Sequence, residues 1–212
     1  MIALGLLLVL GFAQSAAAQS AAAASTPPLS FENNFFVTGD YVVAGAYGMT
    51  TNFTNLKGTT YAVGTMNVPD LKNPFTGATN TGNTGVTSVP AGAEVLTALL
   101  YWQSVEKVGQ PGTGQNGFFR AVNGGAAAPG YAITGVDITT HSTVSFSNGG
   151  CSGGSTGKLV KTYRAAVTAY LPQDPNTGIV LPNTTYQVLL PSTGSTTPIT
   201  LGATLVIIYR IL

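Results

Sequence analysis

The sequence predicts an all-β fold, an antiparallel β-sandwich of jelly-roll-like type that follows an N-terminal signal peptide. Beyond residue 30, apolar residues do not recur with the helical period, whereas short runs rich in β-branched and aromatic residues do recur. The 27 Gly and 12 Pro residues separate these runs, as turn-forming residues do. Residues 2–10 form an apolar core of signal-peptide length. An exported domain built of strands and turns accounts for all three observations.

The N-terminal region is predicted to direct export. Residues 1–18 form the expected signal peptide, because the apolar core from Ile2 to Leu10 is followed by the small residues Ala16-Ala17-Ala18. The core is shorter than the roughly 20 apolar residues that cross a bilayer. An uncleaved anchor is the alternative interpretation. The predicted localisation is therefore secreted or at the cell surface, with membrane contact only through this segment.

Two further segments complete the predicted domain organisation. Residues 19–30 are rich in Ala and Ser and end in the Pro27-Pro28 break, which predicts a flexible linker. Residues 31–212 form the predicted β-sandwich domain. The sequence stops at residues 208–212, inside a run typical of a strand, so we expect the domain to be C-terminally truncated.

Ten runs within the predicted domain have strand character, and no helical segments alternate with them, which favours a sandwich or jelly roll over a parallel sheet. The runs are residues 34–37, 40–47, 61–68, 94–103, 117–122, 133–137, 140–147, 158–163, 185–190 and 203–209. Residues 164–170 are the single predicted helical turn, which Pro172 ends. The longest gap, residues 70–91, predicts a surface loop and is the candidate binding loop.

The composition argues against a nucleic-acid partner and against a disordered chain. Charged residues make up 7% of the chain and the net charge is +1, so no basic field is present to attract a nucleic acid. Apolar residues at 44% and aromatic residues at 9% argue against a disordered chain. The single cysteine, Cys151, has no partner within the sequence, so it is free or pairs outside this chain.

No catalytic centre can be assembled from the sequence motifs. Gly150-Cys151-Ser152-Gly153-Gly154 fits the nucleophile-elbow pattern, but the only histidine, His141, precedes the serine by eleven residues, whereas hydrolases with this elbow have the histidine downstream. A glycine-rich turn is the favoured interpretation. Asp40, Glu94 and Asp137 lie in predicted strands, but nothing pairs these carboxylates for glycoside cleavage. We therefore expect that the protein is not an enzyme.

Metal binding has one weak candidate. His141 and Cys151 are too few ligands for zinc. Asp174-Pro175-Asn176-Thr177-Gly178 contains half of a calcium-loop pattern, so Asp174 and Asn176 are candidate ligands of a structural calcium ion. An ordinary turn is favoured because carboxylates are scarce. No cofactor is expected otherwise.

Two aromatic residues are the candidate ligand-binding residues. Tyr101 and Trp102 follow Leu99-Leu100 and could form a platform on which a sugar stacks. Alternation along a strand turns one of the two rings inward, so packing in the core is the favoured interpretation for one of them.

A short motif near the C-terminal end matches a sorting signal. Leu190-Pro191-Ser192-Thr193-Gly194 has the L-P-x-T-G pattern that sortases cut between Thr and Gly during attachment to a cell wall. The apolar run that follows, residues 199–209, is about half as long as a membrane span. A loop before the last strand is therefore favoured, and Leu190, Pro191, Thr193 and Gly194 remain weak sorting candidates.

Several segments between residues 37 and 210 follow one structural pattern. They are Gly39-Asp40-Tyr41-Val42-Val43-Ala44-Gly45, Val89-Pro90-Ala91-Gly92-Ala93, Leu99-Leu100-Tyr101-Trp102, Cys151, Tyr163-Arg164-Ala165-Ala166-Val167-Thr168 and residues 202–210. Together these segments resemble a domain of large uncharacterised bacterial secreted and cell-surface proteins. Ala166 and Ser152 depart from the acidic residue and the tryptophan of that pattern. The resemblance implies that further β-sandwich modules follow downstream.

The leading prediction is a non-catalytic extracellular module with a structural or adhesive role in a bacterial secreted or surface protein. Its expected partners are other modules of the same polypeptide or other envelope components. The alternative is a carbohydrate-binding module that uses exposed aromatic residues and the loop of residues 70–91 to hold a polysaccharide. A hydrolase that uses Ser152 is the third and weakest hypothesis.

Overall fold

The structure is a computed structural model that describes residues 35, 38–54, 60–68, 88–110, 112–123, 126–127, 130–139, 158–194 and 196–212. The predicted signal peptide and linker, the predicted strand at 140–147, His141, Cys151 and Ser152 lie outside these residues. So do residues 70–87 of the predicted binding loop. Of the predicted strand at 34–37, only Phe35 is described, and it is not in a strand.

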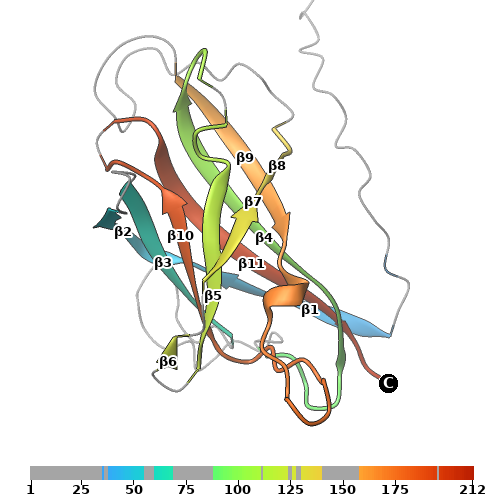
Figure 1. Ribbon diagram of the computed structural model, residues 1–212. Helices are drawn as coiled ribbons and strands as arrows, with labels where there is room; N and C mark the ends of the chain where they lie inside the picture. The colour runs from blue at the N-terminus through green and yellow to red at the C-terminus, as the bar shows by residue number, and fades with distance from the viewer. Residues whose placement is uncertain are drawn as a thin grey trace, which may run out of the picture.

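Two antiparallel sheets pack face to face and form a β-sandwich, which confirms the predicted fold class (Figure 1). The first sheet, sheet A, has the order β1 (Gly39–Gly45), β11 (Ile199–Arg210), β4 (Glu94–Lys107), β9 (Lys158–Ala166) and β8 (Val136–Asp137). The second, sheet B, has the order β2 (Tyr47–Thr54), β3 (Thr60–Asn67), β10 (Thr185–Pro191), β5 (Asn116–Asn123) and β6 (Ala126–Ala127). β7 (Tyr131–Thr134) also pairs with β5.

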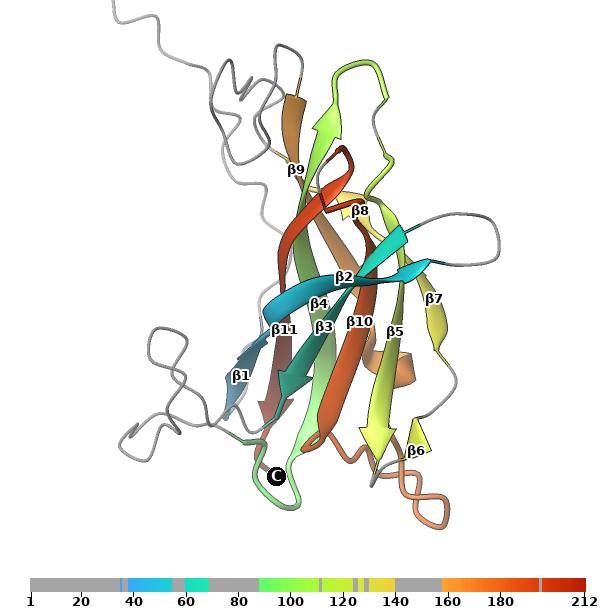
Figure 2. The same cartoon turned by 90° about the vertical axis from the view of Figure 1, so that its left-hand side faces the viewer.

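The chain passes repeatedly from one sheet to the other, and Figure 2 shows sheet B in front of sheet A. β1 lies in sheet A, β2 and β3 in sheet B, β4 in sheet A, and the last two strands, β10 and β11, lie one in each sheet. The C-terminal β11 is inserted between β1 and β4, so segments distant in sequence form the centre of sheet A. The narrower jelly-roll assignment stays a prediction.

Alternating side chains on the strands build the core between the sheets. Along β4, Ala98, Leu100 and Trp102 point inward, as the period of two requires. The largest fully buried side chains come from both sheets and are Trp102, Tyr163, Tyr186, Tyr209, Phe119 and Met66. Burial of these large apolar side chains is the main favourable contribution to the stability of the sandwich.

Two predicted strands are each divided between the sheets, so the predictions at 40–47 and 133–137 are wrong in their continuity. The first is broken at Ala46, whose N–H donates to the carbonyl of Ala203 in sheet A before β2 begins in sheet B. The second is broken at Gly135, between β7 of sheet B and β8 of sheet A. The apolar pattern continues through both crossings because both sheets bury their side chains in the same core.

The predicted helical turn at 164–170 is also wrong over its first three residues. β9 continues to Ala166, where its pairing with β4 keeps Tyr163 and Ala165 opposite Trp102 and Leu100. The helical part is a single 3₁₀ turn, η1 (Thr168–Tyr170). β9 ends at Ala166 because its pairing with β4 does not continue. The N–H of Ala98 donates to the Thr168 hydroxyl, at 2.8 Å, instead of to a backbone carbonyl of the neighbouring strand.

Candidate functional site

The solvent side of sheet A carries two adjacent rows of apolar side chains, and we call it the outer A face. In the first row Tyr41 pairs with Ile208, and in the second Val43 pairs with Val206, which pairs with Leu99. Tyr41 is 59% exposed and Val43 is 44% exposed. The solvent side of an antiparallel sheet is normally polar, and a contiguous apolar patch on it is typical of an interaction surface.

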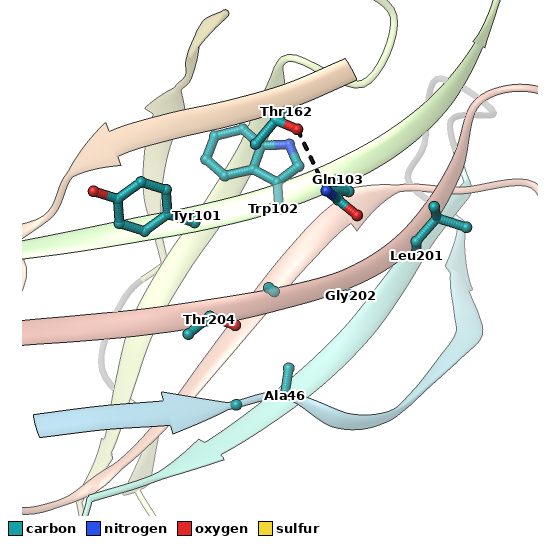
Figure 3. A pocket seen from close by; sticks show the side chains of 10 residues that line it. Ala46, Tyr101, Trp102, Gln103, Thr162, Leu201, Gly202 and Thr204 are labelled. Carbon is teal, nitrogen blue, oxygen red and sulfur yellow. Dashed lines mark hydrogen bonds between the residues drawn. The ribbon is translucent and has the colours of Figure 1, made fainter. Parts of the chain in front are cut away.

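A shallow hollow of about 420 Å³ lies on the outer A face beside these rows (Figure 3). Its walls include Tyr101, Gln103, Thr162, Leu201 and Thr204. None of the described residues that line the hollow is charged. These side chains offer the phenol ring of Tyr101, one amide and two threonine hydroxyl groups, together with the aliphatic chain of Leu201.

Two glycines on neighbouring strands make room for this hollow. Gly45 ends β1 opposite Thr204, and Gly202 follows a register shift in β11 at which Leu201 is the extra residue. A Cβ atom placed on Gly202 would meet no atom within 4 Å. Packing does not require a glycine at position 202, and a larger side chain there would occupy the hollow.

The two candidate aromatic residues face opposite sides of sheet A, as alternation predicts. Trp102 is 1% exposed, and its indole Nε1 donates to the carbonyl of Gly114 at 2.8 Å. Its ring packs against that of Tyr163, with 5.6 Å between the ring centroids. Trp102 is therefore a core residue, which confirms the interpretation that one ring is buried. Tyr101 is half-buried and lines the hollow.

A second hollow, of about 390 Å³, lies further along the same face. It is lined by Phe35, Gly39, Asp40, Tyr41, Val206 and Ile208. Thr204 and Ile208 point to the same side of β11 and are four residues apart, which corresponds to roughly 13 Å along a strand. The two hollows adjoin the apolar row of Val43, Val206 and Leu99 and form one elongated surface, with Tyr101 in the first hollow and Phe35 and Tyr41 in the second.

The solvent side of sheet B has a smaller aromatic group. Tyr61 and Phe118 contact each other edge to face, with 5.8 Å between centroids, beside a hollow of about 400 Å³. Arg120 borders this hollow and donates from Nε and Nη2 to Oε1 of Gln187, at 3.0 and 2.6 Å. The guanidinium group is thus already oriented by a neighbouring strand.

Two of the described carboxylates form ion pairs between neighbouring strands, whereas the exposed Asp40 only accepts a hydrogen bond from the N–H of Tyr41. Glu94 pairs with Arg210, and Asp137 pairs with Lys161 at 2.7 Å. Burial opposes ionisation of Asp137, but hydrogen bonds from Lys161 and Thr139 outweigh it and lower the pKa of this carboxyl group. No cluster of three or more metal-ligating residues occurs in the part of the chain that the structure describes.

Glu106 is fully buried and closes the loop after β4. Its carboxylate accepts hydrogen bonds from the N–H groups of Gly112 and Gly114, at 2.7 and 2.9 Å, and from the Tyr163 hydroxyl at 2.6 Å. Burial and the neighbouring carboxylate raise the pKa of Tyr163, so this hydroxyl stays protonated and donates. The sequence motifs gave no indication of this buried polar group.

The two calcium candidates lie in an Asx turn. Oδ1 of Asp174 accepts from the N–H groups of Asn176 and Thr177, at 2.8 and 3.2 Å. Gly178 has a φ of 69° and donates its N–H to the Asp174 carbonyl. The turn is closed by its own backbone, which is the geometry of an ordinary turn.

The four candidate sorting residues lie at the corner between β10 and β11. Leu190 and Pro191 are buried in β10, and Leu190 pairs with Ala62 of β3. Thr193 and Gly194 are exposed, and the Thr193 N–H donates to the carbonyl of Pro198. The first half of the motif is therefore buried in a strand, and only its second half lies in the segment before the last strand.

The chain matches no protein-family model, no curated protein and no solved structure. In the described residues no helix has the length and apolarity needed to cross a membrane. The outer A face was not predicted from the sequence. The signal for it was present, because Leu99-Leu100-Tyr101-Trp102 and Leu205-Val206-Ile207-Ile208-Tyr209 are continuous apolar runs, which predict strands that are apolar on both sides.

Proposed function

We propose that this protein is a non-catalytic structural or adhesive module of an exported bacterial protein, and that it contacts its partners through the outer A face. The observation that carries the proposal is the pair of apolar rows on β1, β11 and β4, which contain Tyr41, Val43 and Val206. Exposing such rows to water has a free-energy cost, which covering them with a partner removes.

The carboxylates support the non-catalytic part of the proposal. General acid–base chemistry needs a carboxyl group within reach of a substrate. Glu106 is buried, and Glu94 and Asp137 are each held by a cationic side chain on a neighbouring strand. These three groups stabilise the sandwich and its loops, and Asp40 is the one acidic residue among those described that line the two hollows of the outer A face.

Export and adhesion can be tested with the full chain in a bacterial host. We expect protease added to intact cells to digest the protein, and we expect the purified chain to be retained on isolated cell envelopes. Val43→Lys places a charge in the middle of the apolar rows and should reduce retention without changing the melting temperature. Ile179→Lys is the matched control, because Ile179 is 57% exposed in a loop that does not line the outer A face.

Three results would contradict this proposal. Protection of the chain from external protease would argue against export. Equal retention of Val43→Lys and the unmodified chain would show that the outer A face is not the contact surface. Hydrolysis of an envelope polymer by the purified chain, abolished by Ser152→Ala, would show that the protein is an enzyme.

A further inference from the structure

We infer that the outer A face is a binding site for an uncharged polysaccharide, with the hollow at Tyr101 as its principal subsite. This inference rests on the proposed function, since it names the kind of partner that the adhesive face holds. Its support comes from the chemistry of the hollow, from the geometry of its floor and from the length of the surface.

The chemistry of the hollow suits a neutral sugar ring. One face of a pyranose presents C–H groups that pack on an aromatic ring, and its hydroxyls require amide or hydroxyl partners. Tyr101 supplies the ring, and Gln103, Thr162 and Thr204 supply polar groups around it. No described residue lining the hollow at Tyr101 carries the charge that would select a phosphate, a carboxylate or a cation. Arg164 pairs with Tyr101 but is not part of this lining, and Asp40 lines only the second hollow.

The arrangement of these groups is held by the sheet. Tyr101 and Thr204 are directly paired on β4 and β11, and Gln103 is paired with Thr162 of β9. Nε2 of Gln103 lies 3.4 Å from Oγ1 of Thr162 and donates to it (Figure 3). Groups fixed on paired strands lose little conformational entropy on binding, which favours recognition of a weakly interacting ligand.

The floor of the hollow allows a sugar ring to approach the backbone of sheet A closely. Gly45 and Gly202 present backbone where other residues would present side chains, and the space above Gly202 is open. A ring can therefore lie beside Tyr101 at the level of the sheet.

The length of the surface indicates a polymer rather than a single sugar. The second hollow, lined by Phe35, Tyr41 and Val206, lies on the same face, and Val206 is the next outward residue of β11 after Thr204 of the first hollow. The separation of Thr204 from Ile208, roughly 13 Å along β11, leaves room for consecutive sugar units over one continuous strip. Because both hollows are shallow and open to solvent, a chain can enter and leave the strip at its ends.

Affinity electrophoresis tests the inference with defined probes. The full chain is run through native gels that contain hydroxyethyl cellulose, xylan, galactomannan or dextran, and through gels that contain the anionic polymer polygalacturonate. We expect retardation by at least one neutral polysaccharide. Tyr101→Ala should weaken that binding about tenfold, since loss of one stacked ring corresponds to roughly 1.4 kcal/mol. Tyr101→Phe should retain most of it.

A second variant tests the geometry without removing any contact. Gly202→Leu fills the open space with a side chain and should reduce binding as strongly as Tyr101→Ala, while the melting temperature stays unchanged. Phe118→Ala is the matched control, because it removes an exposed ring from the solvent side of sheet B. Binding by Phe118→Ala should equal that of the unmodified chain.

The outcomes separate this inference from the proposed function. Suppose that no neutral polysaccharide retards the chain but Val43→Lys still reduces retention on envelopes. The inferred class of ligand is then wrong, whereas the proposal that the outer A face mediates adhesion is still supported. If the outer A face instead mediates self-association, light scattering will show a dimer that Val43→Lys dissociates, and the polysaccharide site is overturned. Equal loss of binding in Phe118→Ala, or retardation by polygalacturonate alone, would overturn it as well.

Discussion

The hydroxyl of Tyr163 donates a 2.6 Å hydrogen bond to the buried carboxylate of Glu106, across the pairing of β9 with β4. The same carboxylate accepts hydrogen bonds from the backbone N–H groups of Gly112 and Gly114, which follow β4, so one side chain joins a central strand, its neighbour and a loop. A buried carboxylate is tolerated only when its oxygens have donors, and here all three donors come from the sandwich itself.

Removing either partner of this contact should destabilise the protein. Glu106→Gln replaces one acceptor oxygen with an NH₂ group that faces N–H donors, and we expect a loss of about 2 kcal/mol in the free energy of unfolding. Tyr163→Phe should cost about the same, because the carboxylate then lacks one donor. Urea unfolding measures both changes, and the double variant should show non-additive losses.

Glu94→Gln is the control for this prediction. Glu94 is paired with Arg210, and the side chains of both residues are 44% exposed. An exposed ion pair contributes little, so the change should lie within about 0.5 kcal/mol. Losses of similar size in Glu94→Gln and Glu106→Gln would mean that the buried contact contributes no more to the free energy of unfolding than the exposed ion pair does.

Gly135 is predicted to tolerate no side chain. A Cβ atom at this position would lie 2.5 Å from Cη2 of Trp102 and 2.7 Å from Cβ of Tyr163, where the chain crosses from sheet B to sheet A. We expect Gly135→Ala to lower the free energy of unfolding by about 1–3 kcal/mol, as overpacking does. Gly202→Ala, for which the space is open, should be neutral or slightly stabilising. Thermal melts of the two variants distinguish these results. Equal melting temperatures would contradict the close packing of Gly135 against Trp102 and Tyr163.

The two neighbouring aromatic residues of β4 should differ sharply in their contribution to stability. Trp102→Ala removes a fully buried indole and its hydrogen bond to Gly114, and a loss of about 3–5 kcal/mol is expected. Tyr101→Ala removes a ring from the surface, and its effect should be below about 1 kcal/mol. Urea denaturation gives both values. A reversed order would place Tyr101 in the core and would remove it from the binding surface.

Much of the fold was predictable because alternation and turn residues are local signals. The runs at 61–68, 117–122 and 185–190 lie within one residue of β3, β5 and β10 at each end. The inward direction of one ring in Tyr101-Trp102 followed from the strand period alone. The two-sheet sandwich followed from the number of runs and the lack of helical periodicity.

The missed features depend on which strands become neighbours. Ala46 and Gly135 divide predicted strands because the chain changes sheet there, and the apolar pattern does not record such a change. The outer A face exists because β11 lies between β1 and β4, which brings Val43, Val206 and Leu99 into one row. Sequence periodicity gives the side of a strand but not the identity of the strand beside it.

The ion pair between Asp137 and Lys161 should make stability depend on pH in the acid range. The pKa of Asp137 is lowered in the folded protein, so its stabilising contribution is present above the unfolded pKa of about 3.9 and is lost as pH falls through the folded pKa. Asp137→Asn should therefore be less stable than the unmodified chain at neutral pH, and the difference should shrink below about pH 4.

Unfolding by urea at several pH values measures this difference. Lys161→Met should reproduce the effect of Asp137→Asn, since either change removes the 2.7 Å contact. A difference between the unmodified chain and Asp137→Asn that stays constant from neutral pH to about pH 2 would contradict the lowered pKa.

The most direct test of the central claim, that the outer A face is the contact surface, is hydroxyl-radical footprinting of the full chain alone and on isolated cell envelopes. Labelling of Tyr41 and Tyr101 on this face is compared with that of Phe118 on sheet B and of Tyr131, which stacks on Tyr170. The account predicts that binding protects Tyr41 and Tyr101 and leaves Phe118 and Tyr131 unchanged. Protection of Phe118 or Tyr131, with Tyr41 and Tyr101 labelled as in the free chain, would contradict it.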